Sequence, residues 1–219
     1  MVHVMRRGRG RATERHQALG AAAVQYALLG WPVVLGAHPH RGIRGGREPG
    51  RACSCDRVGC PDPGAHPESP AWQMQATVDI NLIRSWWEAR PEANVILVTG
   101  RVFDVLDVPA AAGSAALARI EAGGAAVGPV ARLGQDRMLF FVMTRGAPAD
   151  EDEWWSCGLD CEPESVTPGL RWHCRDSYVL APPSGYGPGL AARWLRTPEK
   201  HPLPDALRLL EYLIDACEG

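Results

Sequence analysis

Apolar residues along the 219-residue chain recur at two spacings, one typical of helices and the other of strands. The first helical pattern can begin with Thr13 as its cap and run to about Leu29, because Leu19, Ala22 and Tyr26 then share one face with Leu29. The run ends at a glycine, and the apolar segment that follows has the length of a buried strand.

The remaining pattern predicts an alternation of helices and short strands. Helices are expected from Thr77 or Asp79 to Pro91, over 112–123 and over 205–217. Strands are expected at 32–35, 94–98, 102–108, 128–134, 137–144, 170–174, 177–183 and 191–196, with 170–174 and 177–183 forming a hairpin. The mixture predicts an α/β fold with a partly antiparallel sheet.

The predicted organisation is one domain with appendages. Residues 1–12 are expected to form a disordered basic tail and residues 13–219 the domain, which includes an insert at 38–70 and a closing helix at 203–219. The apolar run 18–37 is divided by Gly30, Trp31 and Pro32, so a membrane span is not expected there. No cleavable leader is evident, and we expect a cytoplasmic protein.

Composition and charge refine this picture only slightly. Hydrophobic residues make up 46% of the chain and charged residues 22%, which is typical of a globular protein. The net charge is −2, but residues 1–60 carry ten arginines against three acidic residues. A basic N-terminal third could contact phosphate, whereas the whole molecule lacks the strong positive charge of a general DNA binder.

The insert contains a metal-ligand pattern. Cys53, Cys55, Cys60 and His66 are spaced C-x-C-x4-C-x5-H, and three thiolates with one imidazole form a closed, structural type of zinc site. Metal binding would also explain how so long a loop is ordered. The alternatives are free thiols, a disulfide, or His38 or His40 as the fourth ligand. Cys157, Cys161 and Cys174 form a much weaker second set, for which reduced core thiols are the simpler interpretation.

The segment "RVFDVLDVPAAAG" (101–113) places an acid at the end of a predicted strand, where metal-dependent chemistry is common. Side chains alternate along a strand, so Asp107 shares a face with Phe103 and Val105, and Asp104 lies on the other face. A second carboxylate two positions after Asp107 would complete a metal-binding pair, but Pro109 stands there.

Several segments together resemble the N-terminal catalytic domain of bifunctional DNA primase/polymerases, in the archaeo-eukaryotic primase superfamily. The segments are "ALLGWPVVLG", "ATVDINLIRSWWEARPEANVILVTG", "FDVLDV", "RMLFF" and "DSYVLAPPSGYGPG", spread from about residue 17 to 195. The resemblance implies a mixed α/β core with an RRM-like sheet. It also implies nucleotidyl transfer with two divalent ions, Mg²⁺ or Mn²⁺, held by carboxylates.

The same resemblance implies a D-x-D motif, a histidine that contacts the incoming nucleotide, and a further acid on a later strand. Carried onto this chain, these positions are Asp107 and Pro109, then Met138, then Arg171. Met138 cannot donate to a phosphate, and Arg171 is a permanent cation where an acid should attract a metal ion. We therefore predict that Arg171 forms an ion pair with Asp107. Asp160, Glu162 and Glu164 are the acids that could rebuild a metal site, although a solvated loop is the simpler interpretation. His173 shares the strand face of Arg171 and could join the pair or be a buried core histidine.

Other candidate binding groups lie outside the motifs. Arg41, Arg44 and Arg47 precede the cysteines and could bind a triphosphate or a nucleic-acid template, although a solvated basic loop is the simpler interpretation. Only one of Trp86 and Trp87 can point inward from a helix, and Trp87 is expected to be that residue. The turn "APPSGYGPG" (181–189) could border a nucleotide pocket.

The sequence thus supports three functional hypotheses. The preferred one is a primase/polymerase-like domain that has lost nucleotidyl transfer and serves as a nucleic-acid-binding, nucleotide-binding or scaffolding module. The second is an active but divergent primase/polymerase, which alone would need Mg²⁺ or Mn²⁺. The third is a protein-interaction module without nucleic-acid contact.

Overall fold

A computed structural model describes residues 3–41, 51–55, 57, 59–144, 167, 169–187 and 190–218. The chain forms two compact units: unit 1 comprises Met1–Leu97 and Leu180–Ala191, and unit 2 comprises Val98–Val179 and Ala192–Gly219. A single domain was expected from the sequence. None of the helices in the described ranges is long and apolar enough to span a membrane.

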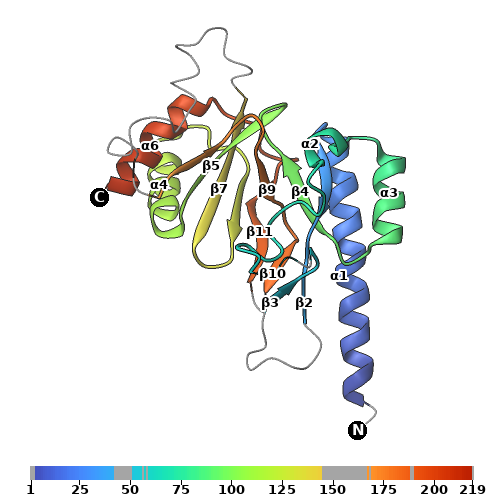
Figure 1. Cartoon of the computed structure of the whole chain (residues 1–219). Helices are drawn as coiled ribbons and strands as arrows, with labels where there is room; N and C mark the ends of the chain where they lie inside the picture. Colours follow the sequence, from blue (N-terminus) through green and yellow to red (C-terminus); the bar gives the residue numbers. More distant parts are fainter. Residues whose placement is uncertain are drawn as a thin grey trace. The chain divides into compact units, whose positions relative to one another are not determined.

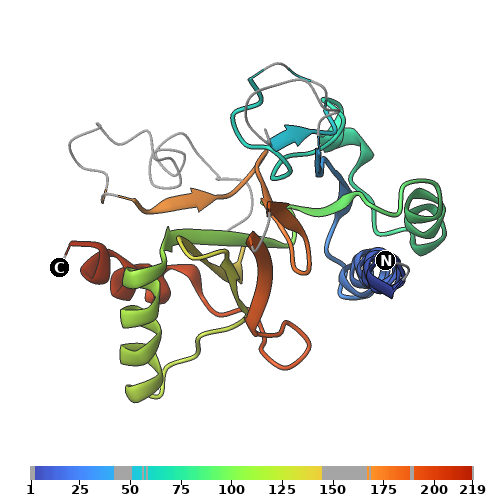
Figure 2. The ribbon, with the colours of Figure 1, turned by 90° about the horizontal axis from the view of Figure 1, so that it is seen from below.

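Unit 1 combines helices with an antiparallel sheet and a hairpin. Its helices are α1 (His3–Leu28), α2 (Trp72–Gln75) and α3 (Ile80–Ala89), and its strands are β1 (Val33–Gly36), β2 (Pro39–Arg41), β3 (Arg51–Cys53), β4 (Asn94–Val98) and β10 (Gly185–Gly187). Strand β4 lies between β1 and β9 (Tyr178–Leu180) in the sheet, and β2 pairs with β3. The helices α1 and α3 lie side by side (Figures 1 and 2).

Two features of the α1–α3 pair follow from local sequence. Asp79 caps α3 because its Oδ1 accepts the backbone N–H groups of Asn81 and Leu82, as the sequence predicted. Helix α1 begins at His3, where a disordered tail was expected. The arginines and alanine of 3–12 favour a helix, whereas Gly8 and Gly10 disfavour it.

Unit 2 is a sheet covered on one face by two helices. Its strands are β5 (Phe103–Pro109), β6 (Val130–Leu133), β7 (Arg137–Met143), β8 (Arg171–His173) and β11 (Leu190–Arg196), and its helices are α4 (Ala110–Ala122) and α6 (Ala206–Glu218). The strand order is β11-β6-β7-β5-β8, with all neighbours antiparallel. The two helices lie on the same side of this sheet (Figures 1 and 2).

The alternation of side chains assigns the two faces of the unit 2 sheet. Leu106, Met138 and Phe140 point toward α4 and α6 and form a core with residues such as Ile120 and Leu213 of those helices. The opposite face carries Phe103, Val105, Asp107, Leu139 and Phe141, because these positions differ by one residue from the core positions. The strand-end acid therefore lies on the face that α4 and α6 do not cover.

The α/β fold class with antiparallel pairing is confirmed. One predicted pairing is wrong. Residues 170–174 and 177–183 do not form a hairpin, because β8 pairs with β5 while β9 joins the sheet of β1 and β4. The turn between them contains Asp176 with a φ of 57°, and Gly100 packs directly against Arg175 in that turn.

Candidate functional site

Asp107 is a buried acid at the end of β5. Only 8% of its side chain is exposed. It lies opposite Leu139 of β7 on one side and opposite Arg171 of β8 on the other. A carboxylate in this position loses most of its hydration, so it needs a partner that supplies charge and hydrogen bonds.

That partner is Arg137, from the first residue of β7. Its Nε donates to Oδ1 of Asp107 at 2.8 Å, and its Nη2 donates to the carbonyl oxygen of Asp107 at 3.0 Å. The same Nη2 lies 2.8 Å from the carbonyl oxygen of Gly169, which precedes β8. The guanidinium therefore reaches across β5 and is fixed at three points.

The predicted ion pair between Arg171 and Asp107 is wrong, because the arginine that pairs with Asp107 is Arg137. Arg171 lies directly opposite Asp107 in the strand register, but its side chain is exposed. Among the residues that the structure describes, no ion pair joins the two. Arg137 takes one oxygen of Asp107, and His173 lies beside the other.

His173 completes the group around Asp107. Its Nε2 lies 3.5 Å from Oδ2 of Asp107, and its Nδ1 lies 2.9 Å from Oγ of Ser177. The sequence had placed this histidine on the Arg171 face of β8, and the contact with Asp107 agrees with that placement. Both carboxylate oxygens of Asp107 thus face nitrogen atoms of this chain.

Met138 and Pro109 contribute to packing around this group. Met138 points away from Asp107, toward α4, where Oγ of Ser114 lies 3.4 Å from its sulfur. The residue of "RMLFF" that bonds to Asp107 is therefore Arg137, one position before Met138, where the resemblance placed a histidine. Pro109 lies opposite Arg137 in the register and precedes the first turn of α4 as its N-cap residue.

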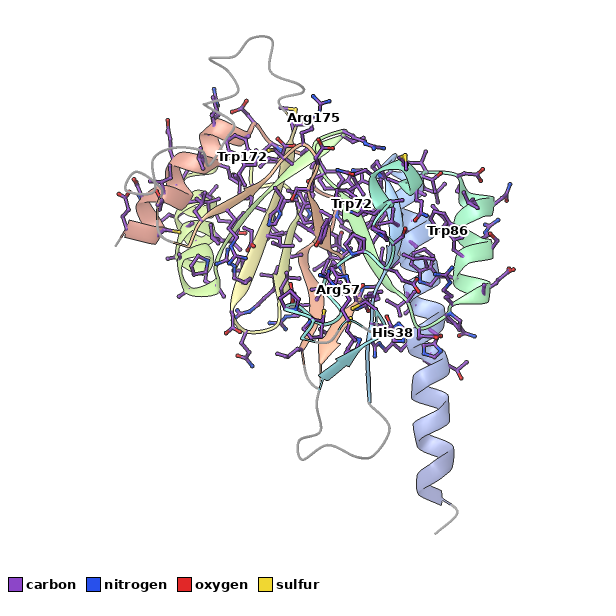
Figure 3. The ribbon with its side chains drawn as sticks, viewed as in Figure 1. His38, Arg57, Trp72, Trp86, Trp172 and Arg175 are labelled. Atoms are coloured by element: carbon purple, nitrogen blue, oxygen red, sulfur yellow. The ribbon has the colours of Figure 1, made fainter. Side chains whose placement is uncertain are left out.

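Asp104 lies on the other face of β5, as predicted, and does not approach Asp107. It is buried, and its Oδ2 accepts a hydrogen bond of 3.3 Å from Nε1 of Trp172. Figure 3 shows Trp172 on β8 and Arg175 in the turn after it. Asp160, Glu162, Glu164, Cys157 and Cys161 lie outside the described residues.

A second site lies in unit 1, where the predicted ligands of the insert come together. One potential ligand atom from each of Cys53, Cys55, Cys60 and His66 lies within 4.8 Å of the others. Nε2 of His66 is 3.3 Å from Sγ of Cys53 and 3.4 Å from Sγ of Cys60. These separations suit a tetrahedral metal ion, whose bonds to sulfur and nitrogen are about 2.0–2.3 Å long. The cluster could hold a metal ion such as zinc.

A hydrogen bond to the backbone orients the His66 ring for metal binding. Nδ1 of His66 lies 2.7 Å from the carbonyl oxygen of Pro67, so this nitrogen carries the proton and Nε2 presents its lone pair to the cysteines. The backbone N–H of His38 donates to Oγ of Ser54, and the cluster formed by the described residues does not include its ring.

The thiols differ in acidity. Burial raises the pKa of Cys53 to about 11, with backbone hydrogen bonds offsetting part of that effect. Burial also acts to raise the pKa of Cys55, but a backbone hydrogen bond from Arg57 and contacts with Cys53, Cys60 and His66 outweigh it and lower the pKa to about 7.

Asn94 connects the cluster loop to two strands. Its Nδ2 donates to the carbonyl oxygens of Gly64 at 2.7 Å and Gly185 at 2.8 Å, and its Oδ1 accepts the N–H of Gly185 at 3.2 Å. Asn94 is fully buried, and Gly64 lies between two of the metal-ligand candidates in the chain. Sequence reasoning missed both Asn94 and Arg137, because neither belongs to a local spacing pattern.

The basic loop before the cysteines is only partly described. Arg41 is the last residue of β2 and pairs with Arg51 of β3. Arg44 and Arg47 lie outside the described residues, so their predicted role as phosphate-binding groups stays a prediction.

Comparison with known proteins gave one family. The family model described as "Bifunctional DNA primase/polymerase, N-terminal" matches residues 23–206. Neither the curated proteins nor the solved structures gave a match. The matched range contains Asp107, Arg137 and the complete cysteine–histidine cluster.

Proposed function

The chain belongs to the family of bifunctional DNA primase/polymerase N-terminal domains, and from this premise we propose that it keeps the family scaffold without nucleotidyl transfer. In this proposal the domain acts as a nucleic-acid-binding, nucleotide-binding or scaffolding module. One observation supports it most directly: Nε of Arg137 donates to Oδ1 of Asp107 at 2.8 Å, so the carboxylate is already paired with a cation.

The charges around Asp107 argue against a pair of divalent ions. A two-metal mechanism needs several carboxylates on one face to offset the charge of the ions. Here the described side chains that contact the carboxylate of Asp107 are Arg137 and His173, and the residue opposite it on β8 is the cationic Arg171. Pro109 provides no oxygen ligand in its side chain. A metal ion would have to displace Arg137 and then lie beside Arg171.

Primer extension and de novo priming with Mg²⁺ or Mn²⁺ test the loss of catalysis. We expect no incorporation above that of a boiled control. Robust incorporation that Asp107→Ala abolishes would overturn the proposal in favour of an active, divergent enzyme.

DNA binding separates a nucleic-acid-binding role from a purely protein-interacting one. We expect affinity that falls steeply with salt and on replacing Arg41, Arg44 and Arg47 with glutamine. Replacing Arg84, Arg193 and Arg208, which are exposed arginines elsewhere, serves as the matched control. Absence of any salt-sensitive binding would favour the protein-interaction module.

We also propose that the metal of the cysteine–histidine cluster is zinc and that its role is structural. Three thiolates and an imidazole form the donor set that zinc prefers, and four protein ligands leave no open position for a substrate. Zinc would add rigidity to the loop 53–66. We further expect this protein to work in the cytoplasm, as the sequence suggested.

A further inference from the structure

A pocket in unit 1 shares no residue with either site described above. Its volume is about 320 Å³. It is lined by residues from β1, from the segment before α2, from α2, and from α3 and its C-cap: Leu35, Glu68, Ser69, Gln75, Trp86 and Arg90. Ligand sites in proteins measure about 300–1,000 Å³, so this pocket could take a single small ring system.

The pocket arises from the way the chain follows the edge of β1. The segment 67–77 pairs with β1 at both of its ends, at Gly36↔Pro67 and at Val33↔Thr77. Between these two bridges it bows away from the strand and forms the short helix α2. The space left by this excursion is bounded by Leu35, the one residue of β1 that is not fully buried.

Trp86 forms an aromatic wall of the pocket. The next residue, Trp87, is buried, and its Nε1 donates to the carbonyl oxygen of Ala93. Trp86 is only partly buried, and within the described part of the chain its indole N–H has no hydrogen-bond acceptor. Figure 3 shows Trp86 on α3. The indole thus lines the pocket and keeps a donor that no described residue occupies.

The polar lining of the pocket has little net charge. Arg90 and Glu68 form an ion pair with each other, so their charges cancel. Gln75 is exposed and offers an amide that both donates and accepts, and the hydroxyl of Ser69 accepts the N–H of Ala71 while keeping its own proton for another partner. Such a lining suits an uncharged ligand with several polar atoms.

We infer that this pocket binds a nucleobase, stacked on Trp86 and hydrogen-bonded along its edge. A nucleobase is neutral and planar, and it presents donors and acceptors side by side, as the polar lining requires. A phenylalanine, tyrosine or tryptophan side chain has at most one polar atom and would leave most of the lining groups without a partner. Base–aromatic stacking contributes substantially to single-strand binding without need of a metal ion.

The base could come from a free nucleoside or from a single strand of nucleic acid. The first arm of the test measures binding of adenosine, guanosine, cytidine and uridine by saturation-transfer NMR, with the metal-cluster loop intact. We expect at least one nucleoside to bind with a Kd on the order of 1 mM, as for one stacking contact with a few hydrogen bonds.

Variants identify the pocket. Trp86→Ala should weaken binding about tenfold or more, whereas Trp86→Phe keeps a ring and should weaken it about threefold. Gln75→Ala, at an exposed position that tolerates truncation, should weaken it about threefold. Met74→Ala is the matched control, because Met74 is 86% exposed on the same helix and does not line the pocket.

A second arm compares a ten-nucleotide single-stranded DNA with the same strand carrying one central abasic site. If the abasic strand binds more weakly than the intact strand, and Trp86→Ala removes this difference, the bound base belongs to a strand. If the two strands bind equally and nucleosides still bind, the ligand is a free nucleoside. No nucleoside binding at about 10 mM, or binding that Trp86→Ala leaves unchanged, would overturn the inference. Because no divalent ion is added, the result is independent of the primer-extension test.

Discussion

Arg137 reaches from β7 to Asp107 on β5 and holds its carboxylate at 2.8 Å. The same guanidinium bonds to the carbonyl oxygens of Asp107 and Gly169, so it bridges β7, β5 and the start of β8. This side chain therefore does two things. It neutralises a buried acid, and it ties together three segments of the unit 2 sheet.

The two arginines near Asp107 should differ sharply in their contribution to stability. Arg137→Ala leaves a buried carboxylate without its cation and should lower the free energy of unfolding by about 2–4 kcal/mol, somewhat less than a fully buried pair because the guanidinium is partly exposed. Arg171→Ala removes an exposed side chain and should change it by less than about 0.5 kcal/mol. Urea denaturation of both variants measures the difference.

The double variant Arg137→Ala/Asp107→Ala provides the control for this pair. It removes the unpaired charge together with its partner, so it should be more stable than Arg137→Ala alone. If Arg171→Ala proved as destabilising as Arg137→Ala, the assignment of the ion pair would be wrong.

The cysteine–histidine cluster should be coupled to Gly185 through Asn94. If the cluster holds a metal ion as proposed, a chelator that removes it should free Gly64, whose carbonyl oxygen accepts a hydrogen bond from Asn94. We expect faster hydrogen exchange of the Gly185 amide after chelation, and its recovery when one equivalent of Zn²⁺ is restored. Exchange measured by mass spectrometry on peptides that cover 178–187 tests this.

Asn94→Ala should have the same effect on Gly185 even with the metal bound. It leaves the polar groups of Gly64 and Gly185 without a partner, and we expect a loss of about 3 kcal/mol in stability. Asn81→Ala, an exposed asparagine on α3, is the matched control and should change neither quantity. Unchanged exchange at Gly185 in both the chelated protein and Asn94→Ala would refute the coupling.

Gly100 should tolerate no side chain. Its φ is +79°, and a Cβ there would lie 2.3 Å from Cα of Arg175. Gly100→Ala should therefore cost about 3 kcal/mol or more. Gly124→Ala is the matched control, since Gly124 has a φ of +69° and open space around its Cβ, and it should cost only about 1–2 kcal/mol. Similar losses in thermal unfolding of the two variants would contradict the close packing of Gly100.

Features with local signals could be predicted from the sequence. The cysteine–histidine cluster follows from a spacing within 14 residues, and the cap of α3 follows from Asp79 and the residues after it. The face on which Asp107 lies follows from alternation along one strand. In each case the information lies within a single element or loop.

The partner of Asp107 could not be predicted in this way, because it depends on the register between two strands. A register shift of one residue moves each side chain of a strand to the opposite face of the sheet. Met138 and Arg137 differ by this one position, and only Arg137 lies on the face of Asp107. Asn94 shows the same limit, since its partners lie 30 and 91 residues away in the chain. Long-range pairing of this kind has no signature in composition or local spacing.

If Arg137 and Arg171 have replaced a metal site, restoring acids should restore metal binding. The variant Pro109→Asp/Arg137→Gln/Arg171→Asp adds two carboxylates to Asp107. The three then lie on one face of the adjacent strands β5 and β8. Asp at position 109 is compatible with the fold, because Pro109 is the N-cap residue of α4 and aspartate is a preferred N-cap. We expect Mn²⁺ binding in this variant, seen as loss of the free-ion signal in electron paramagnetic resonance, and none in the parent chain.

Two further variants decide whether the acids act together. Arg171→Asp alone should not bind Mn²⁺, because Arg137 still occupies Asp107. Adding Asp107→Asn to the triple variant should abolish binding, which would exclude the cysteine–histidine cluster as the source, since Mn²⁺ prefers oxygen ligands. If the parent chain binds Mn²⁺ and Asp107→Asn abolishes that binding, Arg137 must move away from Asp107 when the metal binds. The ion pair would then be a resting state of an active site and not its replacement.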